Sequence, residues 1–525
     1  MKQSLHPILS CTEASTYEAA LLEGSEGRIW DAMNQAGRSL GRAVLRDFNE
    51  LRVFPRDPNI LVLAGKGHNA GDALIAADEL LKARPRGRVV VLCALGEEGL
   101  SPLTEWALSG LREHKSVTLH NFTGGAVHAL FDKLSGERPF DICIDGILGM
   151  QCRPPLRGEL PGLIEGVNSY PGIDFRAAVD LPTGLGDELC ERVFRADFTY
   201  ATGIAKAPLF SEAAQRYVGR IRYLDIGFFD SGEAFSGKEY VLTDAALDPL
   251  RTLRSSQSDK RHYGHLFIVT GSRAYPGALM MSTKAALYGG TGLTTAFAPE
   301  SLAVSFAANL PEAMWSPWPE TASGHLALEG RDALLRRKGE AGTVLIGPGL
   351  GREKETETLV KDLLTNLTCP FVLDADALVP SVLSAIKKRP KDAGPVILTP
   401  HRGEFARISG FEVADQTADV LRAFCKEHGV VTVLKGAVTQ ISDGKTVAYS
   451  LFGGPVLARG GSGDILSGLV ASRLVQDPKP PFEAACEAVV WHGQAADALA
   501  RSRGQIAVAT TQLLSKLSDV LRAPW

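Results

Sequence analysis

The chain has 525 residues, of which 45% are hydrophobic, and a formal net charge of −4 at pH 7. That length is enough for two or three domains with complete hydrophobic cores. The sequence contains no basic tract of the kind that binds nucleic acid and no apolar run long enough to span a bilayer. We therefore expect neither nucleic acid nor a membrane as a partner.

The cysteines and the start of the chain indicate a reducing compartment. Residues 1–15 lack the apolar core of a secretory signal. The eight cysteines are scattered without a CxxC pair, and several sit in strand-like runs, so we expect reduced thiols in a cytoplasmic protein. His262 and His265 lack the further cysteine or histidine partners that a metal site needs.

The first half of the chain alternates short β-branched runs with helical patterns such as residues 71–84. This alternation predicts a doubly wound α/β domain with a parallel sheet covered on both faces. The predicted strands are residues 59–65, 88–95, 140–146, 175–182, 197–202 and 220–227. A polar stretch with glycine and serine, residues 230–239, follows as the predicted linker.

The second half repeats the pattern and predicts a second α/β domain of similar size. Its predicted strands are residues 265–271, 291–298, 342–351, 370–378, 395–401, 430–437 and 438–444. Most of these strands end in glycine or polar residues. Ligands of open α/β sheets bind outside the carboxyl ends of the strands, so these ends are the candidate sites.

The most informative of these segments is residues 453–470, which contain a run of glycines before a predicted helix. In Gly460-Gly461-Ser462-Gly463-Asp464, residues without a Cβ let backbone N–H groups converge on an oxyanion, and the helix dipole adds positive potential. Asp464 is positioned to take a proton from a substrate hydroxyl facing a nucleotide phosphate. A simple turn with an aspartate N-cap is the alternative interpretation of this segment alone.

Other strand ends in the second half add charged groups. Asp374 and Asp376 follow one predicted strand, His401 and Glu404 follow the next, and Lys435 stands beside a glycine turn. A lysine ammonium can bind a nucleotide phosphate. Together with the glycine segment, these residues predict a kinase-like pocket that holds a nucleotide at one end and a hydroxyl-bearing acceptor at the other.

The first half offers three comparable strand ends. The loop 65–73 follows a strand and opens a helix, so its N–H groups can hold a phosphate or a ring amide. Asp145 and Asp180 each end a predicted strand. Each aspartate alone is equally well explained as an N-cap or turn residue. Their shared position at strand ends favours one common crevice.

The motifs of both halves resemble those of known families, and the resemblance covers nearly the whole chain. The second half resembles the ADP-dependent NAD(P)H-hydrate dehydratases of the ribokinase-like superfamily, through GPGLG, VLDADAL, ILTPHRGEF, VLKGAVT and GGSGDILSG in that order. The first half resembles the NAD(P)H-hydrate epimerases. The resemblance implies a Rossmann-like three-layer α/β domain at residues 1–229 and a ribokinase-like α/β domain at residues 238–525.

The resemblance also implies a reaction. NADH or NADPH whose nicotinamide ring has been hydrated carries a ring hydroxyl and exists as R and S epimers. The epimerase of the family interconverts them, and the dehydratase phosphorylates the S hydroxyl with ADP and eliminates phosphate, so that AMP, phosphate and the intact cofactor are released. The expected partners are the NADH and NADPH hydrates and ADP. The expected ions are Mg²⁺ in the dehydratase, because phosphoryl charge needs a counter-ion, and K⁺ in the epimerase. A homo-oligomer is also expected.

Residue roles in the second half follow from the matching motifs. Asp464 would be the base that contacts the substrate hydroxyl, and the nucleotide and its phosphoryl group would be bound by two segments. These segments are Lys435, Gly436, Ala437, Val438 and Thr439, and Gly460, Gly461, Ser462 and Gly463. Gly349, His401 and Thr291, the last in a turn that differs from the family's GAG, would line the hydrated nicotinamide site.

In the first half, Asp180 matches the family's acid/base, and Asn69, Asp145 and Thr183 match its potassium ligands, all oxygen donors suited to a hard cation. The remaining substrate-binding residues would come from two loops. They are His68, Asn69, Ala70, Gly71 and Asp72, and Gly149, Met150, Gln151, Cys152, Arg153, Pro154 and Pro155. The family's GxGNNGGDG reads GKGHNAGDA here. Ala70 and Ala73 are the substitutions of greatest consequence, because alanine tolerates positive φ poorly.

Two alternatives from other classes stand beside this hypothesis. In the first, the chain is a ribokinase-like kinase of another small alcohol, and a phosphorylated product accumulates. In the second, the first half is only a nucleotide-binding or scaffolding module. Separate assays of the R and S hydrates distinguish all three.

Overall fold

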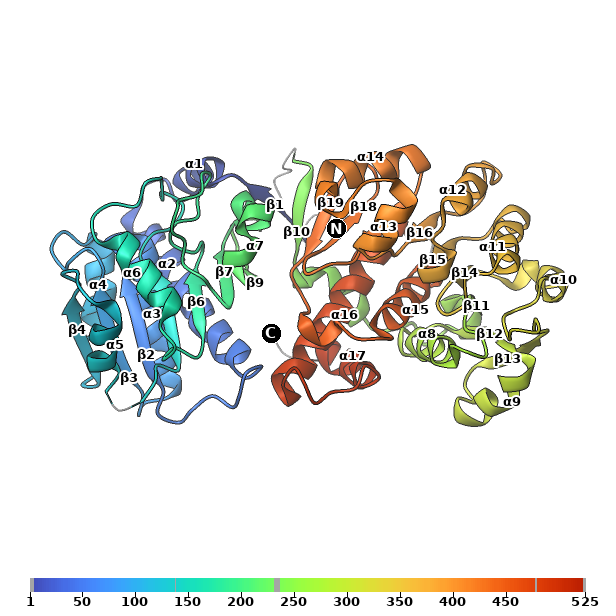
Figure 1. The fold of residues 1–525 in the computed structure, drawn as a ribbon, viewed down its shortest axis with the longest axis horizontal. Helices are drawn as coiled ribbons and strands as arrows, with labels where there is room; N and C mark the ends of the chain where they lie inside the picture. Colours follow the sequence, from blue (N-terminus) through green and yellow to red (C-terminus); the bar gives the residue numbers. More distant parts are fainter. Residues whose placement is uncertain (1–3, 137, 231–236, 477–478, 523–525) are drawn as a thin grey trace. The chain divides into compact units, whose positions relative to one another are not determined.

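The computed structural model describes residues 4–136, 138–230, 237–476 and 479–522 (Figure 1). The chain divides into two units. The N-terminal unit comprises residues 6–235 and 501–504, and the C-terminal unit comprises residues 1–5, 236–500 and 505–525. The predicted linker at 230–239 falls largely on residues 231–236, which lie outside the described residues.

The N-terminal unit is built on one parallel sheet of seven strands. In sheet order these are β4 (Val117–Asn121), β3 (Arg88–Cys93), β2 (Asn59–Ala64), β5 (Ile142–Gly146), β6 (Arg176–Val179), β7 (Phe198–Thr202) and β9 (Arg220–Leu224). Two short strands, β1 (Leu5–Leu9) and β8 (Ala205–Lys206), pair with each other in parallel. The strand order reverses between β2 and β5, which is where ligands of such sheets bind.

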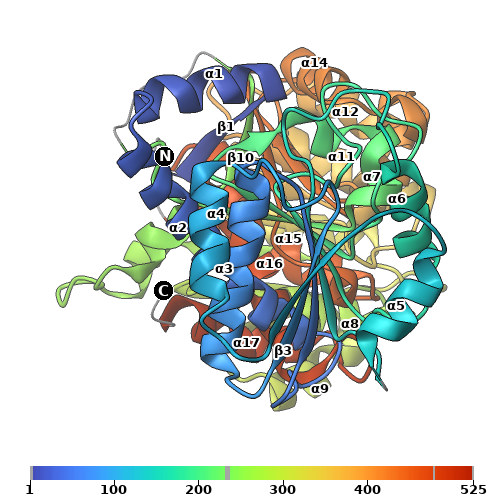
Figure 2. The same ribbon diagram turned by 90° about the vertical axis from the view of Figure 1, so that its left-hand side faces the viewer.

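Helices cover both faces of this sheet, and Figure 2 shows α3 and α4 on one side of β3 and α5 and α6 on the other. The helices are α1 (Cys11–Leu22), α2 (Glu26–Phe48), α3 (His68–Ala83), α4 (Pro102–Leu111), α5 (Val127–Ser135), α6 (Leu160–Ser169) and α7 (Gln215–Val218). Along β2 the side chains alternate: Ile60 and Val62 pack with α2 to α4, whereas Leu61 and Leu63 pack with α5 and α6. The three-layer α/β prediction is therefore confirmed.

Ten strands of the C-terminal unit lie side by side in one sheet, and most of their pairings are parallel. In sheet order the strands are β13 (Met314–Trp318), β12 (Leu293–Pro299), β11 (His265–Val269), β14 (Thr343–Ile346), β15 (Phe371–Leu373), β16 (Val396–Leu398), β17 (Val431–Leu434), β18 (Thr439–Ser442), β19 (Val447–Ser450) and β10 (Glu239–Leu242). The order reverses between β11 and β14. The second α/β prediction is confirmed, with one correction: β18 is antiparallel to β17 and β19, because a four-residue connection cannot cross over to a parallel strand.

The main core of this unit lies between the sheet and α8, α15, α16 and α17. Its helices are α8 (Pro276–Tyr288), α9 (Glu300–Asn309), α10 (Arg331–Arg336), α11 (Lys354–Asn366), α12 (Pro380–Lys387), α13 (Arg402–Ser409), α14 (Ala418–His428), α15 (Ser462–Val475), α16 (Pro481–Arg503) and α17 (Gln512–Arg522). Every residue of α15 from Ile465 to Leu474 is buried. A helix buried on all sides holds its first turn, and thus Asp464, in a fixed position.

Within the described residues, no helix combines the length and apolar character that crossing a membrane requires. The eight cysteines are all free, as expected. Among the same residues, no group of three or more His, Cys, Asp and Glu side chains is arranged to hold a metal ion. His262 instead pairs with Asp259, and His265 hydrogen-bonds Thr295.

Candidate active sites

In the N-terminal unit, the predicted residues meet where the strand order reverses. Asp145 lies in β5, which is paired with both β2 and β6. Its buried carboxylate accepts hydrogen bonds from Thr183 Oγ1 and Thr183 N, both at 2.7 Å, and from Ile147 N at 3.2 Å. Burial raises the pKa of Asp145 to about 6, although these hydrogen bonds act to lower it.

Asn69, in the first turn of α3, lies against the segment that follows Asp145. A Cβ on Gly146 would come within 2.9 Å of the Asn69 carbonyl oxygen, and a Cβ on Gly149 within 3.2 Å of Asn69 Oδ1. Asn69 Nδ2 is buried without a hydrogen-bond partner in the described chain. The structure thus places Thr183 in hydrogen-bond contact with Asp145, and Asn69 against the segment 146–149 that follows Asp145. The amide, carboxylate and hydroxyl oxygens of these three residues suit a hard monovalent cation.

Asp180 follows β6 directly and has φ of +61°, a conformation that is rare for residues other than glycine and clusters at functional sites. Its buried carboxylate forms an ion pair with Lys206 of β8 through Oδ1, which also accepts from Thr202 N at 3.4 Å. The sequence interpretation missed Lys206. The sequence does contain a signal for it, because Lys206 is the one charged residue in the segment 198–209, which begins with a predicted strand.

The altered loop 65–73 adopts a regular conformation. Among the described residues, the non-glycine positions with positive φ are Glu23, Asp180 and Ala375, so Ala70 and Ala73 are not strained as the sequence suggested. Both are fully buried in the core between α3, α2 and the sheet. A Cβ on Gly71 would lie 2.4 Å from Met33 Sδ. Ala70 and Gly71 therefore face the core, and only their backbone can reach a ligand.

The remaining predicted substrate residues of this unit differ in exposure. His68, Gln151, Arg153, Pro154 and Pro155 are exposed, whereas Gly149 and Met150 are half-buried. Cys152 is buried, with its Sγ 3.9 Å from Cys190 Sγ. Asp72 Oδ1 is buried without a partner in the described chain, and burial raises the pKa of this carboxyl well above its usual range.

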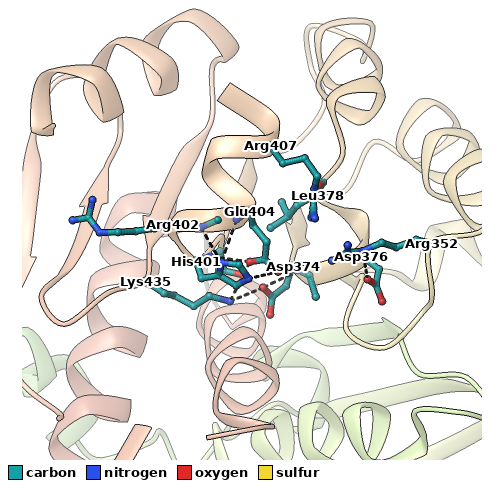
Figure 3. A network of polar contacts seen from close by, with 12 residues as sticks. Arg352, Asp374, Asp376, Leu378, His401, Arg402, Glu404, Arg407 and Lys435 are labelled. Carbon is teal, nitrogen blue, oxygen red and sulfur yellow. Dashed lines mark hydrogen bonds and ion pairs between the residues drawn. The ribbon is translucent and has the colours of Figure 1, made fainter. Parts of the chain in front are cut away.

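In the C-terminal unit, Lys435 and Asp374 form the centre of the second site (Figure 3). Asp374 follows β15 and Lys435 follows β17. Lys435 Nζ lies 2.9 Å from Asp374 Oδ1 and 4.0 Å from Glu404 Oε2. Burial lowers the pKa of Lys435, but these two carboxylates raise it more, so it lies above its ordinary value and Lys435 is a cation at neutral pH.

The glycine segment 460–463 faces this ion pair. Gly461 is the N-cap of α15 and has φ of +85°. A glycine adopts this left-handed conformation without strain. A Cβ on Gly463 would lie 3.2 Å from Lys435 Nζ and 3.8 Å from Asp374 Oδ2. Within the described chain, the N–H groups of Gly463 and Asp464 donate to no backbone carbonyl and are available to an anion at the helix N-terminus.

Asp464 lies in the first turn of α15, directly after the glycine segment 460–463, which we call the cradle. Burial, together with Asp374 and Asp376, raises its pKa to about 6, although Lys435 acts to lower it. A carboxyl with this pKa is mostly ionised at neutral pH yet basic enough to accept a proton, as a general base requires.

The rest of its turn, residues 436–439, and His401 flank Lys435. Residues 435–438 connect the antiparallel strands β17 and β18, with Gly436 and Ala437 exposed and Val438 and Thr439 half-buried. His401 pairs with Lys435 in an isolated parallel bridge and is the N-cap of α13. Its Nδ1 accepts from Gly403 N at 3.0 Å, and its side chain remains 60% exposed.

The loop 347–351 follows β14 at the second reversal of strand order. A Cβ on Gly347 would fall 1.8 Å from the Asp374 carbonyl oxygen, so only glycine fits there. Gly349 has φ of +64° and lies against Tyr275 and Ala278 at the start of α8. Gly351 N donates to Asp376 Oδ2 at 3.0 Å. Gly347 and Gly351 thus place the loop that contains Gly349 beside Asp374 and Asp376.

Thr291 is the exception among the predicted residues. It precedes β12 at the amino end of the parallel strands, whereas Asp374 and Lys435 follow their strands. Its hydroxyl hydrogen-bonds the Ala286 carbonyl oxygen at 2.9 Å and Ser472 Oγ at 3.0 Å. Ser472 is two turns along α15 from Asp464, about 12 Å at 1.5 Å per residue. Thr291 therefore has a packing contact, and the structure does not bring it to the cluster.

Family models match both halves of the chain. A model described as NAD(P)H-hydrate dehydratase matches residues 266–519, and one described as YjeF-related protein N-terminus matches residues 31–207. The bifunctional NAD(P)H-hydrate repair enzyme Nnr of Gloeobacter violaceus is 36% identical over 98% of each chain. That of Moorella thermoacetica is 32% identical over 93% of this chain and 92% of its own.

Two solved structures are similar to the C-terminal unit. A ribokinase-like superfamily protein from Enterococcus faecalis is 27% identical and covers 55% of this chain and 98% of its own, with a TM-score of 0.48. The ADP/ATP-dependent NAD(P)H-hydrate dehydratase from Bacillus subtilis, co-crystallised with ATP/Mg²⁺, is 28% identical over 51% of this chain and 92% of its own, with a TM-score of 0.44.

Proposed function

This chain belongs to the family of bifunctional NAD(P)H-hydrate repair enzymes, and we propose that its two units carry out the two steps of that repair. Residues 1–229 interconvert the R and S hydrates of NADH and NADPH. Residues 238–525 convert the S hydrate back to the reduced cofactor with ADP, releasing AMP and phosphate. The observation that carries the proposal is the convergence of Lys435, Asp374, the 460–463 cradle and Asp464 on one point.

In the dehydratase step, Asp464 takes the proton of the substrate hydroxyl as the hydroxyl oxygen bonds to the β-phosphorus of ADP. The bond from that phosphorus to the bridging oxygen breaks, and AMP leaves with its electrons. The free N–H groups of the cradle bind the transferring phosphoryl group, while Lys435 and the turn 436–439 bind the rest of the nucleotide. The carbon–oxygen bond then breaks and phosphate leaves with the bonding electrons. The neighbouring ring carbon loses a proton, and its C–H electrons form the double bond that restores the ring. Gly349 and His401 line the side of the pocket that takes the hydrated ring.

The donor groups suit a Mg²⁺ ion in this pocket. Magnesium is usually held by one or two carboxylates together with substrate phosphates and water. Asp374 and Asp464 are the carboxylates beside the cradle. When bound, the ion would neutralise charge on the phosphoryl oxygens.

In the epimerase step, Asp180 is the acid/base that moves a proton while a bond to the hydroxyl-bearing carbon breaks and re-forms on the other face. Asn69, Asp145 and Thr183 would hold K⁺, which supplies positive charge beside the bound hydrate. The loops 68–72 and 149–155 contact the hydrate, the first mainly through its backbone. The unstrained conformation of Ala70 and Ala73 supports an active epimerase and argues against a scaffold module.

The proposal extends to a cytoplasmic location, where reduced pyridine nucleotides are used, and to a homo-oligomer. The free, mostly buried cysteines are compatible with the first point. Light scattering on the eluting peak of a sizing column tests the second.

The test supplies purified protein with S-form NADPH hydrate, Mg²⁺ and either ADP or ATP, and follows the absorbance of the restored nicotinamide. Full restoration with stoichiometric phosphate supports the proposal. Accumulation of a phosphorylated nucleotide without restoration favours a small-alcohol kinase. R-form hydrate with K⁺, analysed by chromatography, tests the N-terminal unit in the same way. No acceleration over spontaneous epimerisation favours a scaffold.

A further inference from the structure

Lys206 is an almost completely buried cation next to the proposed acid/base of the epimerase. Its side chain is 1% exposed and that of Asp180 is 8% exposed. Lys206 Nζ donates to Asp180 Oδ1 and, at 3.0 Å, to the Thr202 carbonyl oxygen. Burying a lysine costs several kcal/mol unless a partner compensates for it. A buried lysine that is paired to a single carboxylate therefore has to be explained by what it does to that carboxylate.

The surroundings of Asp180 are otherwise acidic. Glu18 and the Cys11 thiol face the pair from α1, and Asp72 faces it from α3. Burial raises the pKa of Glu18 to about 7 and that of Asp72 well above its usual range, and Asp180 raises both while Lys206 lowers both. Lys206 is thus the cation that offsets the negative charge in this cluster.

The hydrogen bonds on Asp180 are unevenly distributed. Both Lys206 Nζ and Thr202 N donate to Oδ1. Within the described chain, Asp180 Oδ2 accepts no hydrogen bond from a side chain or the backbone. One oxygen is therefore held by the protein and the other is left to act on a proton.

From this geometry we propose that Lys206 is a positioning residue for the epimerase: its ammonium places a positive charge beside Asp180 and fixes Oδ1, so that Oδ2 is left free to act on the substrate. The inference rests on the proposed role of Asp180. Lys206 itself exchanges no proton with the substrate. Loss of its ammonium would remove both the hydrogen bond that fixes Asp180 Oδ1 and the positive charge that opposes the acidic side chains of Glu18 and Asp72.

The test measures epimerisation of R-form NADPH hydrate by the full chain from pH 5 to 9, with the spontaneous rate subtracted. Four variants are compared: Lys206→Met, Lys206→Arg, Asp180→Asn and the control Lys82→Met. Lys82 pairs with Asp78 on the exposed side of α3. Dehydration of the S hydrate by each variant serves as an internal activity control.

We expect Lys206→Met to lose about 10-fold or more at pH 7 and to recover toward pH 9. Its acidic limb should move up by about 1–3 pH units, the effect of removing an opposite charge at this range. Lys206→Arg should keep the acidic limb of the wild type even if its maximal rate falls, because it retains the charge. Lys82→Met should match the wild type, and Asp180→Asn should be inactive at every pH.

Three outcomes overturn the inference. A uniform loss at every pH in Lys206→Met shows a packing role only. An equal displacement of the acidic limb in Lys206→Arg and Lys206→Met shows that the charge is not responsible. A wild-type pH profile in Lys206→Met, together with an inactive Asp180→Asn, shows that Lys206 does not position Asp180, although Asp180 itself is required. Activity in Asp180→Asn instead refutes the proposed function on which the inference depends.

Discussion

Replacing Asp464 by asparagine should abolish dehydration and at the same time make the C-terminal unit more stable at neutral pH. As the base, Asp464 should account for about 10²–10⁴-fold of the rate. Its effect on stability follows from its surroundings: burial and the neighbouring Asp374 and Asp376 raise its pKa from 3.8 to about 6. The folded chain therefore binds this proton more tightly than the unfolded chain.

The sign of the effect follows from that difference. The Asp464 carboxyl imposes no cost below about pH 3.8, the cost grows as the pH rises, and it is complete above about pH 6. A shift of about two pKa units corresponds to about 3 kcal/mol, which solvent screening at this half-buried position reduces to about 1–2 kcal/mol. The helix-dipole interaction that asparagine loses is smaller, about 0.5 kcal/mol. A net gain at pH 7.5 is the expected result.

Urea denaturation at pH 4.5 and pH 7.5, without nucleotide, measures this gain. The unfolding transition of the C-terminal unit is first identified in the wild type as the one that added ADP shifts. Asp464→Asn should be more stable than the wild type by about 1 kcal/mol at pH 7.5 and by much less at pH 4.5. The matched control is Asp376→Asn, which keeps a single acceptor oxygen for Gly351 N and Arg352, loses the charge that pairs with Arg352, and should be destabilised. Lower stability of Asp464→Asn at pH 7.5, or near-normal turnover, refutes the reasoning.

Three further predictions concern the nucleotide pocket, the glycine loop and the cation site. Lys435→Ala should weaken ADP binding at least 10-fold while S-hydrate binding changes little, measured by calorimetry; equal losses for both ligands point to misfolding. Gly347→Ala should destabilise the C-terminal unit by about 3 kcal/mol or more, because its Cβ meets the Asp374 carbonyl, whereas Gly339→Ala, which meets no atom within 4 Å, should be neutral in thermal denaturation. Thr183→Ala should raise the K⁺ concentration for half-maximal epimerisation at least 10-fold, and an unchanged K⁺ titration contradicts the assigned ligand set.

Local sequence patterns were sufficient to predict where most of the candidate site residues lie in the fold. Buried β-branched runs followed by glycine or charged residues located the carboxyl ends of β5, β6, β15 and β17, and hence Asp145, Asp180, Asp374 and Lys435. These are statements about a few neighbouring residues, for which pattern and propensity suffice.

Other features depend on contacts between distant parts of the chain. The pairing of Lys206 with Asp180 depends on β8, a two-residue strand that no periodicity reveals. Thr291 was assigned to the site from its motif, although its turn opens at the amino edge of the sheet. The edge strands β4 and β13 were missed because polar residues or proline interrupt their apolar pattern. By contrast, the antiparallel pairing of β18 could have been predicted from the sequence, since adjacent strands with so short a connection form a hairpin.

The most direct test of the two-step account compares the wild type with Asp180→Asn on R-form NADPH hydrate, in the presence of K⁺, Mg²⁺ and ADP. The absorbance of restored NADPH is followed to completion. The account predicts that the wild type restores the R form well above the spontaneous rate. Asp180→Asn should restore it only as fast as the hydrate epimerises spontaneously, while repairing the S form normally. Equal restoration of the R form by both proteins, or no restoration of the S form by either, would contradict it.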